Sequence, residues 1–406
     1  KHPTAGEHAV ETLLAERNIA PSIPGSQPAP GGRVLVIGAG PAGLATTACL
    51  RAAGVNTHLV DRTGEPGGAY AKLYGGITLS SPKRFTQLPG LAIEAEGDYV
   101  TIAQYREYLR RYADRFGLLP EQRGVERIKR VGPRFAVTFT GRRQPVVYEA
   151  VVAATGMVDS PARPRIEGLS DHGLASDDGP RVLHSRDWPG HAAMAGRRVL
   201  IIGGASSAIA IAEECGHAGL PVVVSTRQKR IRFSLSRLLG FDLRELVYPL
   251  TRRLPRWLMG SFCDQRPPYP ATDMGFRQLC REGVIEVRPG VRRFDGRVAE
   301  FSDGSRQEFD VVVLATGYRF AMPFLPEEVA RASAGQPLAD GGESTSWPGL
   351  YFVGIPCGRT LGSAFLHGMA ADAPVVAQRI QARLSRLCPG LPGRPKFSRP
   401  LALPAA

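Results

Sequence analysis

The stretch that most constrains the fold of this chain is residues 33–61, RVLVIGAGPAGLATTACLRAAGVNTHLVD. Its four consecutive apolar residues, Val34–Ile37, predict a strand that is buried on both faces of a parallel sheet. A glycine-rich turn and a helix follow, and residues 57–60 form a second apolar strand that ends at Asp61. Strand, glycine turn, helix, strand and acid in this order predict a dinucleotide-binding βαβ unit.

The glycines of this turn have the spacing G-x-G-x-x-G, and each has its own physical task. Gly38 permits a tight turn, Gly40 lets the backbone approach a pyrophosphate, and Gly43 lets the helix pack closely on the strand. The N–H groups and the dipole at the start of the helix favour phosphate binding. Asp61 lies 23 positions after Gly38, where its carboxylate can accept hydrogen bonds from ribose hydroxyls.

A second unit of the same kind begins at residues 198–203, RVLIIG, 165 positions after the first. Its loop, residues 203–208, reads GGASSA, so Ala205 and Ala208 stand where the fingerprint has its second and third glycines. A methyl group at Ala205 crowds a pyrophosphate unless the loop shifts slightly. The pattern therefore predicts a second dinucleotide site with a weaker fingerprint.

The residue after the second strand of this unit predicts which cofactor binds there. The strand is followed by Ser-Thr-Arg-Gln-Lys-Arg, and Arg227 lies 24 positions after Gly203, which we match to the place of Asp61. A guanidinium offers a bidentate fork to a 2′-phosphate, whereas a site for NADH needs a carboxylate there. We therefore expect NADPH, and the alternative is a solvated basic run with no ligand.

Two further segments are expected to build the protein core and to cross the sheet. Residues 101–116 read as a helix with Tyr105, Tyr108 and Tyr112 along one side, a stripe typical of core packing. Residues 125–140 and 145–149 alternate between apolar and polar positions, which predicts a small β-meander.

Charge and cysteine content narrow the possible partners and the compartment. The net charge of +14, from 51 basic and 37 acidic residues, is spread along the chain, so we expect no nucleic-acid partner. No apolar run reaches 18 residues, so we expect no membrane span. Six cysteines without a C-x-x-C pair argue against a disulfide framework, a zinc site or a dithiol redox pair, and predict a reducing cytoplasm.

At this point residues 33–384 resemble the flavin-containing monooxygenases, above all bacterial and plant members such as the YUCCA-type enzymes. The segments that carry the resemblance are GAGPAGL at 38–44, EPGGAY at 65–70, LSSPKRFTQLPG at 79–90, ATG at 154–156, GGASSA at 203–208, TR at 226–227, YPATDMG at 269–275 and ATGY at 315–318. The resemblance implies an α/β fold of two nested Rossmann-like domains, with an NADPH domain inserted into an FAD domain.

The same resemblance implies a reaction. In that family NADPH reduces FAD, and O₂ then forms a flavin C4a-(hydro)peroxide that oxygenates a small organic molecule. We expect N- or S-oxygenation or hydroxylation, with a small-molecule substrate and O₂ as the partners and a homodimer left open.

The expected domain boundaries follow from the two fingerprints. They are an N-terminal extension and linker at 1–32, a first part of the FAD domain at 33–190, the NADPH domain at 191–305 with an insertion at 231–275, a second part of the FAD domain at 306–388, and a Pro-rich tail at 389–406.

The candidate site residues combine the motifs with the resemblance. Ser80 stands where many family members have an asparagine near the flavin, and it is the candidate catalytic residue; no metal is expected. The residues expected to contact a cofactor are Gly38, Gly40, Pro41, Ala42, Gly43, Asp61, Arg62, Gly68, Tyr70, Val125, Thr155, Gly156, His184, Ser185, Gly203, Ala205, Ser206, Ser207, Arg227, Thr316, Gly317 and Tyr318.

Two alternative activities stay open at this stage. His184 followed by Trp188-Pro189 resembles the Baeyer–Villiger branch, which oxygenates a carbonyl carbon. Ser80 has one hydroxyl where an asparagine has an amide, so the chain could instead be an NADPH oxidase or reductase that inserts no oxygen. A redox-sensing binding module without catalysis is a third hypothesis that no residue specifically favours.

Overall fold

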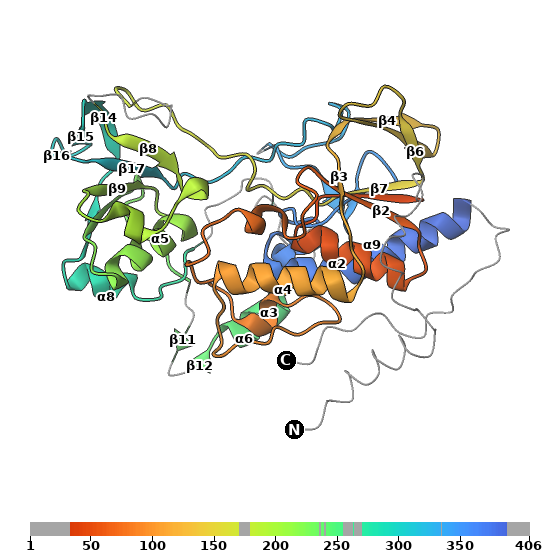
Figure 1. Cartoon of the computed structure of the whole chain (residues 1–406), viewed down its shortest axis with the longest axis horizontal. Helices are drawn as coiled ribbons and strands as arrows, with labels where there is room; N and C mark the ends of the chain where they lie inside the picture. Colours follow the sequence, from red (N-terminus) through yellow and green to blue (C-terminus); the bar gives the residue numbers. More distant parts are fainter. Residues whose placement is uncertain are drawn as a thin grey trace.

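The computed structural model describes residues 33–169, 179–234, 237–238, 241–254, 263, 270–333 and 335–387. These residues form two lobes, each built around its own parallel sheet and joined by crossing segments of chain (Figure 1). The predicted N-terminal extension, 1–32, and the predicted tail, 389–406, lie outside the described residues.

The first lobe contains a seven-stranded sheet with the order β18-β19-β20-β7-β1-β2-β3. Its strands are β1 (Val34–Ile37), β2 (Thr57–Asp61), β3 (Glu121–Gln122), β7 (Ala150–Ala153), β18 (Ala339–Asp340), β19 (Glu343–Ser344) and β20 (Leu350–Phe352). β1 pairs in parallel with β2 and β7, and its four residues are buried, as the continuous apolar run predicts.

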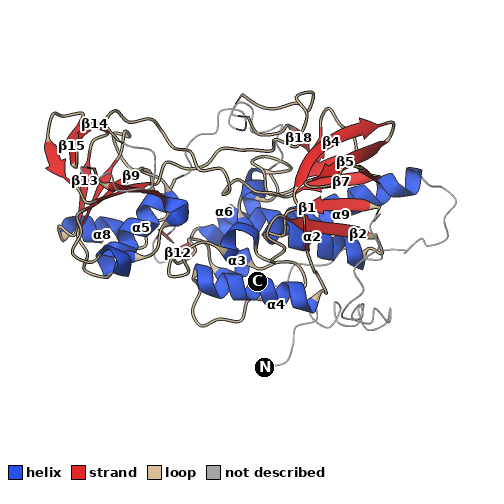
Figure 2. Ribbon diagram, turned by 45° about the horizontal axis from the view of Figure 1, so that its top comes forward, coloured by secondary structure: helices blue, strands red, loops and turns tan. Residues whose placement is uncertain are grey.

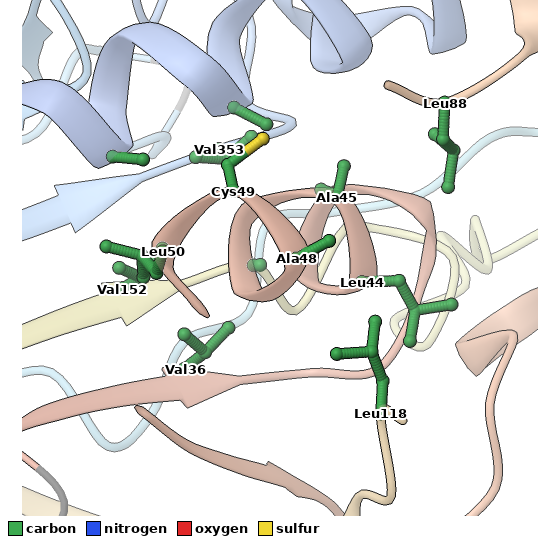
Figure 3. Close-up of a cluster of buried hydrophobic side chains, with 14 of the residues drawn as sticks. Val36, Leu44, Ala45, Ala48, Cys49, Leu50, Leu88, Leu118, Val152 and Val353 are labelled. Carbon is green, nitrogen blue, oxygen red and sulfur yellow. The ribbon is translucent and has the colours of Figure 1, made fainter. Parts of the chain in front are cut away.

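Helices cover one face of this sheet (Figure 2). They are α2 (Pro41–Ala52), α4 (Ile102–Arg115) and α9 (Leu366–Leu387), with the short α3 (Lys83–Thr86) near the start of α9. Figure 3 shows α2 packed between the strands and α9, with Leu44, Ala48 and Leu50 inside the cluster. The tyrosine stripe of α4 is buried in this same cluster, which confirms the prediction of core packing.

The other face of the sheet carries the predicted β-meander. It consists of β4 (Val125–Val131), β5 (Arg134–Phe139) and β6 (Val146–Tyr148), which form an antiparallel sheet. Phe135, Val137 and Phe139 on β5 are buried against the strands of the main sheet. The alternation in the sequence therefore predicted these strands, and the structure shows that the apolar positions of β5 face the main sheet.

The second lobe contains a five-stranded parallel sheet with the order β13-β10-β9-β17-β8. Its strands are β8 (Arg181–His184), β9 (Val199–Ile202), β10 (Val222–Ser225), β13 (Ile285–Arg288) and β17 (Val311–Leu314). Helices α5 (Ser206–His217) and α8 (Phe276–Arg281) pack on it. A smaller antiparallel sheet of β14 (Val291–Asp295), β15 (Val298–Phe301) and β16 (Arg306–Glu308) completes the lobe.

Sheet membership differs from the domain boundaries that we predicted at residues 191 and 306. β8 begins at Arg181 and β17 ends at Leu314, and both strands pair within the second sheet. The second lobe is therefore longer at both ends than predicted. An apolar strand followed by Thr-Gly occurs in both lobes, and the sequence of one strand does not determine which strand it pairs with.

The predicted insertion, 231–275, is described only in part. Within it lie β11 (Arg237–Leu238), β12 (Phe241–Asp242) and α6 (Arg244–Thr251), and α6 lies beside α3 in Figures 1 and 2. Further along the insertion, Cys263 is bonded to Cys357 as a disulfide. Our expectation that the scattered cysteines form no disulfide is therefore wrong, because spacing cannot reveal a pair separated by 94 positions.

No helix in the described part of the chain combines the length and the apolar character that crossing a bilayer requires.

Candidate cofactor sites

The first glycine turn is tightly packed wherever the fingerprint requires it. Gly38 has φ +103°, and a Cβ atom added there would lie 2.6 Å from the carbonyl oxygen of Ala154. A Cβ atom at Gly43 would lie only 1.8 Å from the carbonyl oxygen of Gly38, so α2 begins against the turn itself. Gly40 has nothing within 4 Å of that position, so it leaves open space at the start of α2. This is the geometry that a pyrophosphate needs.

Asp61 is held in place by three hydrogen bonds. Its Oδ2 accepts the Ala39 N–H at 2.9 Å, and its Oδ1 accepts the N–H and the hydroxyl of Thr63 at 2.8 and 2.7 Å. The carboxylate therefore closes the turn after β1 onto the end of β2. A remaining lone pair on Oδ2 can accept a ribose hydroxyl.

A cavity of about 430 Å³ lies next to this turn. The predicted cofactor contacts that line it are Gly38, Gly40, Pro41, Ala42, Asp61, Arg62, Gly68, Tyr70, Val125, Thr155 and Gly156. The hydroxyl of Thr155 is buried without a hydrogen-bond partner, so it is available to a polar ligand. The glycine cradle, the acid and this hydroxyl together fit the phosphate and ribose portions of FAD.

Other cavity residues were not found from the sequence. The carboxylate of Asp159 accepts a hydrogen bond from Arg62 at 2.6 Å and forms an ion pair with the Nη2 of Arg186 at 3.2 Å. The Nη1 of Arg186 also donates to the carbonyl oxygen of Asp159 at 3.2 Å. Asp159 is on the first crossing segment, and Arg186 follows β8 of the second lobe. No motif marks them, because only the crossing of the chain brings them to the cavity. Val353, Gly354 and Ala364 line it from the segment between β20 and α9, and Met369 lines it from the first turn of α9.

The second glycine turn repeats the first with differences. A Cβ atom at Gly203 would lie 2.3 Å from the carbonyl oxygen of Ala315, just as Gly38 packs on Ala154. Ala205 is the N-cap residue of α5, and its side chain makes no capping hydrogen bond. No N-cap side chain therefore accepts the first N–H groups of the helix. Ser206 is exposed and Ser207 half-buried in this first turn of α5. Their phosphate contacts remain a prediction.

The strand register corrects the residue that we matched to Asp61. Ile37 pairs with Val60 in the first sheet, and Ile202 pairs with Ser225 in the second. The next residue along is Asp61 in the first lobe and Thr226 in the second, so Thr226, and not Arg227, takes the place of the acid.

Thr226 also reproduces the local contacts of Asp61. Its hydroxyl accepts the Gln228 N–H at 3.2 Å, and a Cβ atom at Gly204 would lie 2.6 Å from it. Arg227 is exposed one residue further along, with its stem against Gly290. The second site therefore has no carboxylate at this position and has a guanidinium beside it.

The predicted residues around His184 form the connection between the lobes. The two crossing segments pair through a bridge between Pro161 and Tyr318, and the ring of Tyr318 meets His184 edge-on. The Nε2 of His184 donates to the carbonyl oxygen of Gly317 at 3.1 Å, and its Nδ1 accepts the Arg186 N–H. Burial lowers the pKa of His184, so the neutral ring fits both bonds. Ser185 is buried beside it, and Thr316 donates to the backbone of the first crossing segment.

Ser80 is exposed and is not among the residues that line the cavity. The adjacent Ser81 meets the hydroxyl of Tyr248 on α6 at 3.2 Å. The catalytic role of Ser80 remains a prediction.

Comparisons with known proteins place these features in a family. The sequence model of the family "Pyridine nucleotide-disulphide oxidoreductase" matches residues 35–241, about half of the chain, and "Flavin-binding monooxygenase-like" matches residues 272–337. The chain belongs to the pyridine nucleotide-disulphide oxidoreductase family, and the second model and the relatives support a flavin monooxygenase family. The family implies an oxidoreductase that carries FAD.

The relatives can be aligned with this flavin monooxygenase over most of its length. It is 29% identical to the probable indole-3-pyruvate monooxygenase YUCCA8 of Arabidopsis thaliana, over 85% of this chain and 88% of the relative. A flavin-containing monooxygenase from Stenotrophomonas maltophilia is 25% identical, with a TM-score of 0.70, over 87% of this chain and 99% of the other. Cyclohexanone monooxygenase, at 16% identity and a TM-score of 0.64 over 88% of each chain, shares the fold.

Proposed function

We propose that this flavin monooxygenase uses NADPH and O₂ to insert one oxygen atom into a small organic molecule. The balanced reaction consumes NADPH, a proton, O₂ and the substrate, and it releases NADP⁺, water and the oxygenated product. FAD supplies the redox chemistry when bound, taking electrons from the nicotinamide and passing them to O₂. The residues of the chain bind and orient the two nucleotides.

The replacement of the acid by Thr226 is the observation that carries the choice of NADPH. A carboxylate there would repel a 2′-phosphate, whereas the hydroxyl of Thr226 does not, and Arg227 stands beside it with an exposed guanidinium. In the first lobe Asp61 keeps the carboxylate that suits the unphosphorylated ribose of FAD. The first lobe thus favours a ribose without a 2′-phosphate, and the second lobe favours a ribose that carries one.

The first lobe would hold FAD through its turn, its helix and its cavity. Gly40 and the start of α2 would receive the pyrophosphate, and Asp61 the adenosine ribose. Tyr70 lines the cavity, and burial raises its pKa to about 12, so the phenol remains a neutral hydrogen-bond donor. Thr155 offers a further hydroxyl.

The relatives suggest which substrates to test first. The name of the Arabidopsis relative gives indole-3-pyruvate as its substrate, so a 2-oxo acid joins amines and thioethers as candidates. The experiment incubates the FAD-loaded protein with NADPH and ¹⁸O₂ and each of indole-3-pyruvate, a tertiary amine, a thioether and a cyclic ketone. We expect one ¹⁸O atom in one organic product, with one NADPH consumed per product molecule.

The same experiment decides between the alternatives. NADPH consumption with hydrogen peroxide as the only product, for every substrate, would replace the proposal with a non-oxygenating oxidase. A lactone or ester from the ketone alone would indicate the Baeyer–Villiger alternative. Trp188 gives no support to that alternative, because its indole N–H donates to Glu214 at 2.6 Å inside the core of the second lobe.

A further inference from the structure

The disulfide between Cys263 and Cys357 joins the insertion to the segment that borders the flavin cavity. We call residues 355–367, which lead from the end of β20 into the first turn of α9, the 355–367 segment. Ala364 of this segment lines the cavity, as do Gly354 just before the segment and Met369 just after it, on α9. Both cysteines are buried, with 4% and 3% of their surface exposed. Cys357 is three positions after Gly354, so the disulfide is attached close to a wall of the cavity.

The insertion contacts this same segment at several other points. The ring of Tyr248 on α6 stacks on His367 at 4.2 Å and 7°. The Nε of Arg252 donates to the carbonyl oxygen of His367 at 3.0 Å, and the Leu361 N–H donates to the carbonyl oxygen of Leu254 at 3.3 Å. All these contacts are non-covalent and individually weak. Among the described residues, the disulfide is the one covalent connection between the insertion and the 355–367 segment.

Cys357 occupies a backbone position that disfavours a side chain. Residues 355–358 form a turn closed by a hydrogen bond from the Gly358 N–H to the carbonyl oxygen of Ile355. Cys357 is the third residue of this turn and has φ +52°, where glycine or asparagine is usual. It is the only non-glycine residue with positive φ in the described part of the chain. The disulfide holds this conformation in place, together with the bond from Gln336 to the carbonyl oxygen of Cys263.

We propose that Cys263 and Cys357 form a reversible redox site, which a dithiol reductant opens, and whose oxidised form ties the insertion to the 355–367 segment beside the flavin cavity. Because both cysteines are buried, the thiolate of the reductant attacks one sulfur when this region opens locally, forming a mixed disulfide and releasing the first cysteine thiolate. The second thiol of the reductant then closes its own disulfide and releases the other cysteine. Two electrons and two protons pass to the protein, which gains two thiols.

The consequence of opening concerns the retention of FAD. Without the covalent connection, the 355–367 segment is held to the insertion by the Tyr248 stack and a few hydrogen bonds. Ala364, which lines the cavity from this segment, then separates more readily from the cavity. The inference rests on the proposed FAD site for this consequence, whereas the disulfide itself does not depend on it.

The first experiment tests the bond in the full-length flavoprotein. Protein purified without reductant is alkylated in denaturant, digested and mapped by mass spectrometry, before and after treatment with dithiothreitol. We expect a peptide pair linked through Cys263 and Cys357 that separates on reduction. Free alkylated Cys263 and Cys357 in the untreated protein would overturn the proposal, whatever cofactors or substrates the protein uses.

The second experiment measures FAD release by flavin fluorescence, without NADPH or substrate. We expect dithiothreitol to accelerate release several-fold, and reoxidation to restore the slow rate. Cys263→Ser should release FAD fast with or without reductant. Cys357→Gly should do the same, and its folding is protected because glycine suits the turn. Cys280→Ser, which removes a cysteine outside the disulfide, is the matched control and should respond to reductant as the unmodified protein does.

Equal release rates in the oxidised and reduced forms would contradict the redox role. An acceleration of release from Cys263→Ser by reductant, as large as that from the unmodified protein, would contradict it too. A failure of the NADPH assignment would leave both experiments unaffected, since neither uses that nucleotide.

Discussion

The two lobes build the same strand–turn–helix unit, and they hold its helix in different ways. α2 is buried and apolar from Leu44 to Leu50 apart from two threonines, and it packs between β-strands and α9. α5 carries Glu213 and Glu214 at the positions that correspond to Ala48 and Cys49. The first lobe therefore fixes its helix by close packing, and the second adds carboxylates that bind neighbouring loops.

The carboxylates of α5 have specific partners. Glu213 accepts the N–H groups of Met274 and Phe276, so it caps the start of α8. Glu214 accepts the indole N–H of Trp188 and the N–H of His191, in the segment between β8 and β9. The two units also differ at the third glycine of the fingerprint. α5 has Ala208 there, whereas in the first lobe a Cβ atom at Gly43 would lie 1.8 Å from the carbonyl oxygen of Gly38.

The strongest test of this contrast is the third glycine of each turn. Gly43→Ala should destabilise the protein by ~3 kcal/mol or more and abolish FAD binding, because its methyl group would overlap the Gly38 carbonyl. Ala208→Gly in the second lobe should cost about 1 kcal/mol, the usual effect of glycine inside a helix. Urea unfolding and the flavin absorbance of the purified protein measure both changes. A yellow, stable Gly43→Ala protein would show that the first turn is not tightly packed.

The next test makes the second lobe resemble the first. Thr226→Asp places a carboxylate at the position of Asp61 and should raise the KM for NADPH by roughly a hundred-fold, since a like charge would face the 2′-phosphate (about 1.4 kcal/mol for each ten-fold). The KM for NADH should fall or stay unchanged. Thr226→Ser keeps the hydroxyl and is the control. If Thr226→Asp affected both nucleotides equally, the register that matches Thr226 to Asp61 would not determine ribose preference.

A smaller effect is expected from the neighbouring guanidinium. Arg227→Ala should raise the KM for NADPH by roughly ten-fold, because one charge-assisted hydrogen bond to an exposed phosphate is lost. The KM for NADH should change little, and Lys229→Ala in the same basic run should have less effect on NADPH. Steady-state kinetics with the two nucleotides measure this selectivity. Equal losses for Lys229→Ala and Arg227→Ala would favour a diffuse basic surface instead of a phosphate contact.

The smallest effect concerns the pH dependence of stability through Glu213. Burial raises its pKa to about 7, against the bonds from Met274 and Phe276 that favour the charged form. The folded state thus binds this proton more tightly than the unfolded state. Stability should therefore fall as pH rises from about 4.5 to about 7, and then level off.

Glu213→Gln removes this charge and keeps an oxygen that accepts both bonds. It should be more stable than the unmodified protein above pH 7, and the difference should shrink as pH falls toward 5. Urea midpoints at pH 5 and pH 8 give the comparison, with the exposed Glu107→Gln of the first lobe as the control. A difference that does not depend on pH would mean that Glu213 acts through packing alone.

Local patterns in the sequence determined both βαβ units of this protein. The apolar run Val34–Ile37, the glycine spacing after it and the tyrosine stripe of α4 each act over a few residues, so they predict local structure and burial directly. Six residues that line the cavity were predicted from one continuous unit, because the glycine turn, Asp61 and Arg62 are close in sequence. Five further predicted residues line the cavity from outside that unit: Gly68, Tyr70, Val125, Thr155 and Gly156.

The tertiary structure alone decided which distant segments meet. The pairing of β17 with β8 and β9 moved the lobe boundary, and the register of β9 and β10 put Thr226 at the place of the acid. Asp159 reaches Arg62 and Arg186 only because the chain crosses between the lobes, and Cys263 reaches Cys357 across 94 positions. Such contacts depend on how whole elements pack together, and a short sequence pattern carries no information about a partner so far along the chain.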